Sequence, residues 1–338
     1  MIYVIAFYHR IPDKQVLELV PAADVNAEIA AKVNTGEEYE YTIVTYNVGF
    51  GAYSPDYSFF MDGGKSSWAK SKESAAALIT GAGELSLSFE PDFVLFQEID
   101  YDSTRTYHLD EYGLLKNKLS EYMSVRAVNY DSAFLLYPIY EPHGSSKSGI
   151  ATFSKYEITG SVRRSLPVSN DFNRFLDLDR CYTVSRLNTD NGKELVIINI
   201  HMSAYGRTEA VRSGQIMMLC EEMQAEYDKG NYVIVGGDFN HNLKIYDDHG
   251  NMGWAKAYDR SCIPDAFTFA IDLLDEDFKY NMHNSCRDAG KPYSETNSTV
   301  TLDGFIISDN IKCIEYENID EGFAYSDHDP VVMRFVLE

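Results

Sequence analysis

The sequence predicts an α/β protein built around one main domain. Short apolar runs rich in Val, Ile and Phe recur along the chain and are typical of buried strands. Between them lie longer stretches with helical composition or periodicity. No internal repeat, low-complexity tract or linker-like change of composition divides the 338 residues. A chain of this length is compatible with one large α/β domain or two ordinary ones, and the even composition favours one.

The strands that we expect are short and rich in β-branched or aromatic residues, which favours strands over helices. Most of them end in a polar residue, after which a loop or helix begins. The predicted strands are Gln15–Val20, Tyr41–Tyr46, Phe93–Phe96, Gly149–Phe153, Leu195–Ile200, Tyr232–Val235 and Phe305–Ile307.

Two segments between these strands predict helices. Ser71–Leu85 is rich in Ala, Lys and Glu, and Arg207–Asp228 carries its apolar residues on one stripe. The second helix should end at Lys229-Gly230, a cation followed by a C-cap glycine.

Two other segments, Gly49–Lys65 and Tyr246–Asn297, predict long loops of irregular structure. Loops of this length in a compact domain often form the walls or lids of a site. The aromatic stretches Tyr53–Phe60 and Phe134–Tyr140 are suited to stacking against bases, sugars or lipid head groups.

Residues 1–40 are expected to form an N-terminal segment before a main domain at 41–338. The first eight residues are apolar, but crossing a bilayer takes about 20 residues. They also lack the charged start and cleavage site of a signal peptide. Two interpretations stay open, an ordinary strand or the stump of a membrane anchor. An anchor stump would imply membrane contact and an extracytoplasmic or membrane-anchored location. An ordinary strand would imply a cytoplasmic location.

The chain is strongly acidic, with 52 acidic against 29 basic residues and a formal net charge of −23. Such a charge repels polyanions and weighs against non-specific binding of nucleic acid. It also provides the carboxylates that a site for hard cations requires. The five cysteines form no CxxC pair, which argues against a disulfide framework or a zinc-thiolate site. A single disulfide between Cys262 and Cys286 remains compatible with the sequence.

Polar residues that could carry chemistry stand where the apolar strands end. Any one of them is ordinarily a turn former or a helix cap. Taken together, their types suit one reaction at one edge of a sheet. They are Asn47, Glu98, His201, Asp238, Asn240, Asp303, Asp327 and His328.

This set resembles the motif series of the endonuclease/exonuclease/phosphatase superfamily, which includes DNase-I-like nucleases, bacterial sphingomyelinases and inositol polyphosphate phosphatases. The order of the motifs matches over about residues 40–338. The resemblance implies a four-layer αββα sandwich, with two mostly antiparallel sheets flanked by helices, and a catalytic domain at 41–338. The motifs are Asn47, Gln97-Glu98, His201, Gly237-Asp-Phe-Asn240, Leu302-Asp303 and Ser326-Asp-His328.

Hydrolysis of a phosphoester requires neutralised phosphoryl oxygens, a positioned water and help for the leaving oxygen. The resemblance implies that Glu98, Asp327 and Asn47 hold Mg²⁺ or Mn²⁺, with Asn47 also able to donate to phosphate. Arg180 and Arg105 are candidate phosphate clamps, and a buried ion pair is the alternative for each.

The remaining residues are implied to carry proton transfer and charge stabilisation. Asp303 would orient His328, while Asp238 would position the water. Asn240 would hold a phosphate oxygen, and His201 would donate to the phosphoryl group as charge builds. Whether His328 or Asp238 is the general base is left open.

The sequence therefore predicts a metal-dependent phosphoester hydrolase in which water attacks phosphorus. Its charge favours a small phosphorylated metabolite or a phospholipid head group as substrate. The first alternative is a DNA or RNA endonuclease or exonuclease, and the second is a catalytically silent binding module on the same scaffold. Serine-hydrolase, P-loop and HExxH motifs are absent from the sequence. We expect a monomer.

Overall fold

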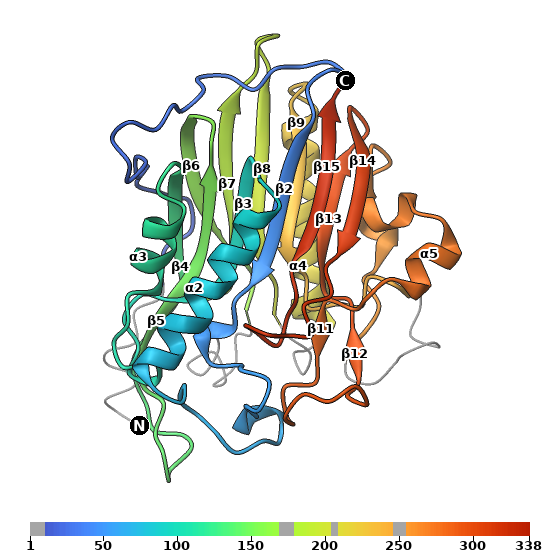
Figure 1. Cartoon of the computed structure of the whole chain (residues 1–338). Helices are drawn as coiled ribbons and strands as arrows, with labels where there is room; N and C mark the ends of the chain where they lie inside the picture. Colours follow the sequence, from blue (N-terminus) through green and yellow to red (C-terminus); the bar gives the residue numbers. More distant parts are fainter. Residues whose placement is uncertain (1–10, 169–178, 204–208, 246–254) are drawn as a thin grey trace.

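The protein is a sandwich of two β-sheets with helices on both outer faces (Figure 1). The structure is a computed structural model, and it describes residues 11–168, 179–203, 209–245 and 255–338. The predicted four-layer architecture, with two mostly antiparallel sheets, is confirmed. In each sheet, one parallel pair joins strands that are otherwise antiparallel.

The first sheet has six strands in the order β14-β15-β2-β3-β5-β4. Its parallel pair is β2 with β3, and a register shift between Phe96 and Ile99 interrupts the pairing of β3 with β5. The strands are β2 (Tyr41–Asn47), β3 (Phe93–Asp100), β4 (Met123–Leu135), β5 (Gly144–Ser154), β14 (Ile311–Asn318) and β15 (Val331–Leu337).

The second sheet has seven strands in the order β1-β6-β7-β8-β9-β13-β10, and its parallel pair is β8 with β9. The strands are β1 (Gln15–Val16), β6 (Ile158–Ser165), β7 (Cys181–Asn188), β8 (Glu194–His201), β9 (Tyr232–Asp238), β10 (Phe267–Phe269) and β13 (Asp303–Ser308). A separate short pair consists of β11 (Cys286–Arg287) and β12 (Thr299–Val300).

Helices cover the outer faces of both sheets. In Figure 1, α2 (Lys72–Ser88) and α3 (Glu111–Lys118) lie in front of the six-stranded sheet, and α4 (Glu209–Tyr227) lies behind the other. α2 begins at Ser71, whose hydroxyl accepts a hydrogen bond from the backbone N–H of Ser74. The other helices among the described residues are short: α5 (Glu276–Asn281) and the 3₁₀ turns Gly49–Gly51, Phe60–Asp62, Thr104–Thr106, Arg260–Cys262 and Ala270–Leu273.

Most of the predicted elements are present. The apolar runs beginning at Tyr41, Phe93, Gly149, Leu195, Tyr232 and Phe305 all lie in strands, and the helix predicted from Ser71 is α2. The second predicted helix is α4, although residues 207 and 208 lie outside the described part. The strand predicted at Gln15–Val20 is confined to two residues, followed by a single bridge from Val20 to Ser124.

Residues 11–40 pack along the main domain instead of standing apart from it. β1 pairs with β6, and Val33 is fully buried and bridges to Thr189. Whether residues 1–8 are a strand or an anchor stump lies outside the described residues. In the part of the chain that is described, no helix has the length and apolarity needed to cross a membrane. All five cysteines are free thiols, so Cys262 and Cys286 form no disulfide in this structure.

The strand directions bring most of the chemically interesting residues to one end of the sandwich, which we call the site edge. β2, β3, β8 and β9 all end there, whereas β13 begins there. The site edge is the lower end of the sandwich in Figure 1.

Candidate active site

The strand register places three of the predicted site residues side by side in the seven-stranded sheet. His201 at the end of β8 lies opposite Asp238 at the end of β9, and Asp238 lies opposite Asp303 at the start of β13. Asn47 reaches Asp238 from the other sheet, with its Nδ2 donating to Oδ2 at 3.0 Å. The site therefore spans both sheets, and its parts are fixed by rigid strands.

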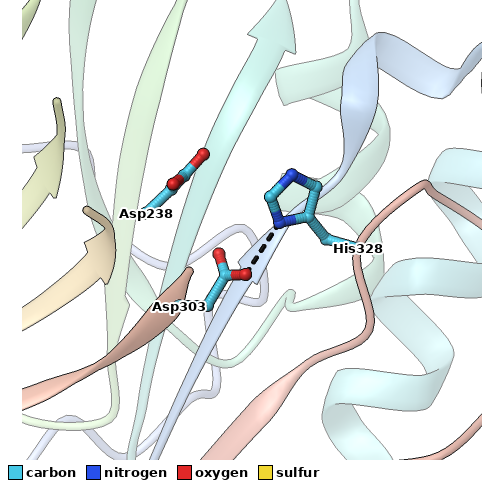
Figure 2. A group of neighbouring side chains, drawn as sticks. All are labelled: Asp238, Asp303 and His328. Atoms are coloured by element: carbon cyan, nitrogen blue, oxygen red, sulfur yellow. Dashed lines mark hydrogen bonds and ion pairs between the residues drawn. The ribbon is translucent and has the colours of Figure 1, made fainter. Parts of the chain in front are cut away.

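His328 and Asp303 form a buried pair (Figure 2). His328 Nδ1 lies 2.7 Å from Asp303 Oδ2, which also accepts a hydrogen bond from the Ser285 hydroxyl at 2.7 Å. Burial opposes protonation of His328, but the Asp303 carboxylate outweighs it and holds the pKa of the imidazole well above its usual value. Because Asp303 binds Nδ1, it leaves Nε2 of His328 as the nitrogen available to a substrate or water.

Asp238 is a buried carboxylate held by several donors. Its Oδ1 accepts from the backbone N–H of Asn240 at 2.8 Å, and its Oδ2 accepts from the Asn240 side-chain amide at 3.2 Å. Burial alone would raise the pKa of Asp238. The hydrogen bonds with His201 and the Asn240 backbone and the charge of His328 outweigh burial, so the pKa lies below its ordinary value and the group is ionised.

Gly237 allows β9 to place Asp238 at this position. Its φ is +147°, and a Cβ there would lie 2.0 Å from the carbonyl oxygen of Ile200 on the neighbouring strand. Only glycine fits this close approach. Two other site residues, Glu98 and Asn240, have positive φ values of 56° and 51°. Positive φ is costly for residues other than glycine and is found at functional sites, where the surrounding structure imposes it.

His201 lies between a cation and two carboxylates. Its Nε2 is 3.3 Å from Asp238 Oδ2 and 3.7 Å from Glu98 Oε1, and Nη1 of the buried Arg180 also lies against it. Burial and the charge of Arg180 lower the pKa of His201, so its imidazole is neutral. Of the two predicted phosphate clamps, Arg180 thus lies within the site.

Arg105 has a different environment. Its Nε and Nη2 both donate to the buried Asp100 at 2.9 Å, and its guanidinium lies 3.6 Å from the centre of the Phe50 ring. The structure thus places Arg105 in the buried ion pair that the sequence left as its alternative, with two nitrogens already engaged. Its binding of substrate stays a prediction.

The predicted metal ligands are gathered at the same edge. Burial raises the pKa of Asp327, and the negative charge of the nearby Glu98 raises it further. Two carboxylates in such proximity are the donor set that a divalent cation would stabilise. Asn47 contributes an amide oxygen, which accepts from the backbone N–H of Gly49 at 3.0 Å and retains a second lone pair.

Two further carboxylates of the site lie close together beside His328. In the part of the chain that the structure describes, Asp238, Asp303 and His328 offer ligand atoms that all lie within 4.8 Å of one another. Oδ1 of Asp303 is buried and has no hydrogen-bond partner among the described residues. The site residues therefore fit a divalent metal, although the structure does not identify the ion.

Three neighbours of the site were not predicted from the sequence. The Ser285 hydroxyl donates to Asp303, and Cys286 forms an isolated antiparallel β-bridge with His328. The backbone N–H of Arg287 donates to the Asp327 carbonyl at 2.9 Å. All three lie in the segment predicted as a long irregular loop, which instead contains β10, α5 and β11, and no motif or periodicity distinguishes them there. The positive charge of Arg287 favours ionisation of Asp327 and opposes the effect of burial.

The two aromatic stretches differ in their surroundings. Tyr53, Tyr57 and Phe59 are buried in a cluster with Phe50, so they support the site wall and are not free to stack on a ligand. In contrast, large apolar side chains of the second stretch, including Tyr137 and Tyr140, are exposed.

Comparison with known proteins agrees with this geometry. The sequence profile of the Endonuclease/Exonuclease/phosphatase family matches residues 44–328. The chain therefore belongs to this family, whose members are typically hydrolases that act on phosphoester bonds. A sequence comparison with curated proteins found no match.

Solved structures of the same superfamily share the fold. An endonuclease/exonuclease/phosphatase from Beutenbergia cavernae DSM 12333 has a TM-score of 0.60 and 14% identity, covering 88% of this chain and 72% of that one. TDP2 from D. rerio, complexed with a single-strand DNA product, has a TM-score of 0.57 and 14% identity, with coverages of 88% and 98%. ANGEL2, described as a 2',3'-cyclic phosphatase, has a TM-score of 0.58 and 13% identity, with coverages of 89% and 96%.

Proposed function

We propose that this chain is a divalent-metal-dependent phosphoester hydrolase in which water attacks phosphorus. The observation that carries the proposal is the convergence of the ionised Asp238 with the His328–Asp303 pair, whose ligand atoms lie within 4.8 Å. A carboxylate that can orient water beside an oriented imidazole is the arrangement that proton transfer to and from phosphate oxygens requires.

The protein side chains have complementary roles in this proposal. Asp238 orients the attacking water, and Asn240, which donates to Asp238 at 3.2 Å, holds a phosphate oxygen beside it. His328 exchanges a proton or donates to a phosphoryl oxygen through Nε2, with Asp303 fixing its ring. Arg180 lies against His201 and provides positive charge where negative charge builds on the phosphoryl group.

Glu98 and Asp327, with the amide oxygen of Asn47, would hold the metal. When bound, a Mg²⁺ or Mn²⁺ ion supplies neutralising charge for the phosphoryl oxygens. The proximity of the two carboxylates supports this assignment, because the charge of Glu98 raises the pKa of Asp327.

A small phosphorylated metabolite or a phospholipid head group is the substrate that we favour. The net charge of −23 opposes the approach of a long polyanion and supports this choice. A nuclease activity is the alternative, since the superfamily includes proteins such as TDP2, solved with a single-strand DNA product. A silent binding module would not need the ionised Asp238 next to a paired His328.

The test is hydrolysis across a panel of substrates with Mg²⁺ or Mn²⁺. The panel contains plasmid DNA, RNA, bis-p-nitrophenyl phosphate, sphingomyelin, and sugar and inositol phosphates, each with wild type, Asp238→Ala and His328→Ala. Metal-dependent turnover that is lost in both variants is the expected result. Turnover that persists in both variants would remove the mechanism, and preferred cleavage of DNA or RNA would replace the favoured substrate class.

A further inference from the structure

An exposed apolar loop projects from the site edge. This rim loop comprises residues 136–143 and connects β4 to β5. Four of its side chains are largely exposed: Leu136 at 60%, Tyr137 at 62%, Ile139 at 79% and Tyr140 at 71%. Single exposed apolar residues are common on proteins, but four in one short loop indicate an interaction surface.

The rim loop lies at the same end of the sandwich as the candidate active site. β5 follows the loop directly, and its Ser148 pairs with Asp100, two residues after Glu98 on β3. Figure 1 shows the turn between β4 and β5 extending beyond the lower end of the sheets. A surface that received this loop would therefore face the site edge.

The loop is held in place by contacts at its base. The Trp68 indole N–H donates to the Pro142 carbonyl at 2.9 Å, and the Ser67 hydroxyl donates to the Glu141 carbonyl at 2.8 Å. The Phe60 ring packs at 5.4 Å from the Tyr137 ring and 5.6 Å from the His143 ring. These contacts support a fixed loop whose tip side chains point into solvent, so less ordering is needed when they bind.

The rim loop carries one formal charge, on the exposed Glu141. Its one carboxylate, on Glu141, accepts a hydrogen bond from the backbone N–H of Ser67 at 3.2 Å. Burial lowers the pKa of His143 to about 3, so this residue is neutral. Near the loop, the Tyr140 hydroxyl donates to the carbonyl of Lys65, an exposed residue. The loop thus combines aliphatic tips, two tyrosines and a nearby lysine on a protein of net charge −23.

We propose that the rim loop inserts into the head-group region of a zwitterionic phospholipid surface and brings the site edge to the lipid phosphates. Aliphatic residues gain from leaving water, and tyrosine favours the boundary between apolar and aqueous phases. The tip is a projection and not a groove, which suits penetration of a soft surface. The net negative charge disfavours an anionic surface and leaves a zwitterionic one.

This inference deepens the proposed function, because it favours a phospholipid head group over a soluble metabolite as substrate. Its substrate part rests on the proposed hydrolase activity, whereas binding to the surface does not. Experiments can therefore separate the failure of one from the failure of the other.

The test is co-sedimentation of the full chain with phosphatidylcholine vesicles. We compare wild type with Leu136→Ser/Ile139→Ser and with a matched control, Val25→Ser/Ile314→Ser. The control residues are 94% and 42% exposed, and they lie near the start of β4 and on the edge strand β14. All four positions are exposed, so the unfolding midpoints should stay at the wild-type value.

We expect the vesicle affinity of the rim-loop variant to be lower than that of wild type by a factor of at least about ten. The control should bind like wild type. Wild-type protein that does not bind, or equal binding by both variants, would overturn the proposal. Self-association of wild type that the rim-loop variant abolishes would also overturn it, in favour of a second copy of the chain. Hydrolysis of soluble bis-p-nitrophenyl phosphate should be equal in all three proteins. If none of them hydrolyses it, the proposed hydrolase activity is refuted, whereas vesicle binding is tested independently.

Discussion

The two ends of the sandwich use their charged and polar side chains in opposite ways. At the end opposite the site edge, Arg186 donates to Glu226 at 2.6 Å and to Glu194 at 2.7 Å. Asn231 donates to the other oxygen of Glu226 at 3.1 Å, and Lys229 also pairs with Glu226. These charges are paired within the protein, and they tie the end of α4 to β7, β8 and β9.

The site edge keeps some of its polar groups without such partners. Among the described residues, Asp303 Oδ1 and His201 Nδ1 are buried and lack a hydrogen-bond partner. Glu98 and Asn240 also adopt positive φ. Unpaired polar atoms and backbone strain cost stability, and natural proteins retain them where a ligand uses them. We infer that the charged groups at the far end stabilise the fold, whereas the polar groups at the site edge serve catalysis.

Asp303→Asn should produce the largest effect of the substitutions that test this comparison. It removes the negative charge that orients the His328 ring and keeps its pKa high, and we expect kcat to fall about 10²–10⁴-fold. The measurement is Mn²⁺-dependent hydrolysis of bis-p-nitrophenyl phosphate. Asp309→Asn, just beyond the other end of β13, is the matched control because the Asp309 carboxylate accepts a hydrogen bond only from the Tyr227 hydroxyl in the described part of the chain. An unchanged kcat in Asp303→Asn would remove the pair from the mechanism.

Glu226→Gln should reduce stability without reducing kcat. The substitution removes the buried carboxylate that Arg186 and Lys229 share, while Arg186 keeps its contact with Glu194, and we expect the unfolding free energy to fall by about 1–3 kcal/mol in urea titrations at neutral pH. A large loss of kcat with unchanged stability would reverse the roles that we assign to the two ends.

The contribution of Glu226 should also depend on pH. Burial opposes its ionisation, but Arg186 and Lys229 outweigh burial and lower the pKa from 4.5 to about 2. The carboxylate therefore stabilises the fold fully above pH 4.5, and its contribution disappears as the pH falls from 4.5 to about 2. Between these values the stability of wild type should approach that of Glu226→Gln, which urea titrations along the pH series would measure.

Gln97→Leu should have a smaller effect at the junction of the two sheets. The Gln97 amide donates to Asn199 at 2.9 Å, and Asn199 donates back to the Ala151 carbonyl at 2.9 Å. Leucine leaves the Asn199 oxygen without this donor, so we expect a loss of about 1–3 kcal/mol in unfolding free energy. The double variant Gln97→Leu/Asn199→Leu should lose less unfolding free energy than the sum of the two single substitutions. Additive losses in urea titrations would contradict this coupling.

The sequence predicted the fold and the strand ends better than it predicted their connections. Each motif residue from Asn47 to His328 ends or borders an apolar strand, so both its identity and its place could be anticipated. Strands β6 and β14 were missed because exposed and partly buried residues interrupt their buried positions, which leaves no continuous apolar run. β4 was missed for a similar reason.

Partner choice was beyond what local sequence can specify. Arg105 and Arg180 were equivalent candidates, and only the fold placed the first against Asp100 and the second against His201. Likewise, Ser285 and Arg287 reach the site through β11 and the loop before it, where local sequence gives no indication of their neighbours. Long-range packing decides these contacts, and a single sequence does not record it.

The most direct test measures the rate of Mn²⁺-dependent bis-p-nitrophenyl phosphate hydrolysis in wild type, Asp238→Asn and Glu226→Gln under identical conditions. The account predicts that Asp238→Asn loses at least about 10²-fold in kcat while Glu226→Gln retains the wild-type rate. Wild-type activity in Asp238→Asn would contradict the assignment of the site edge as the catalytic centre.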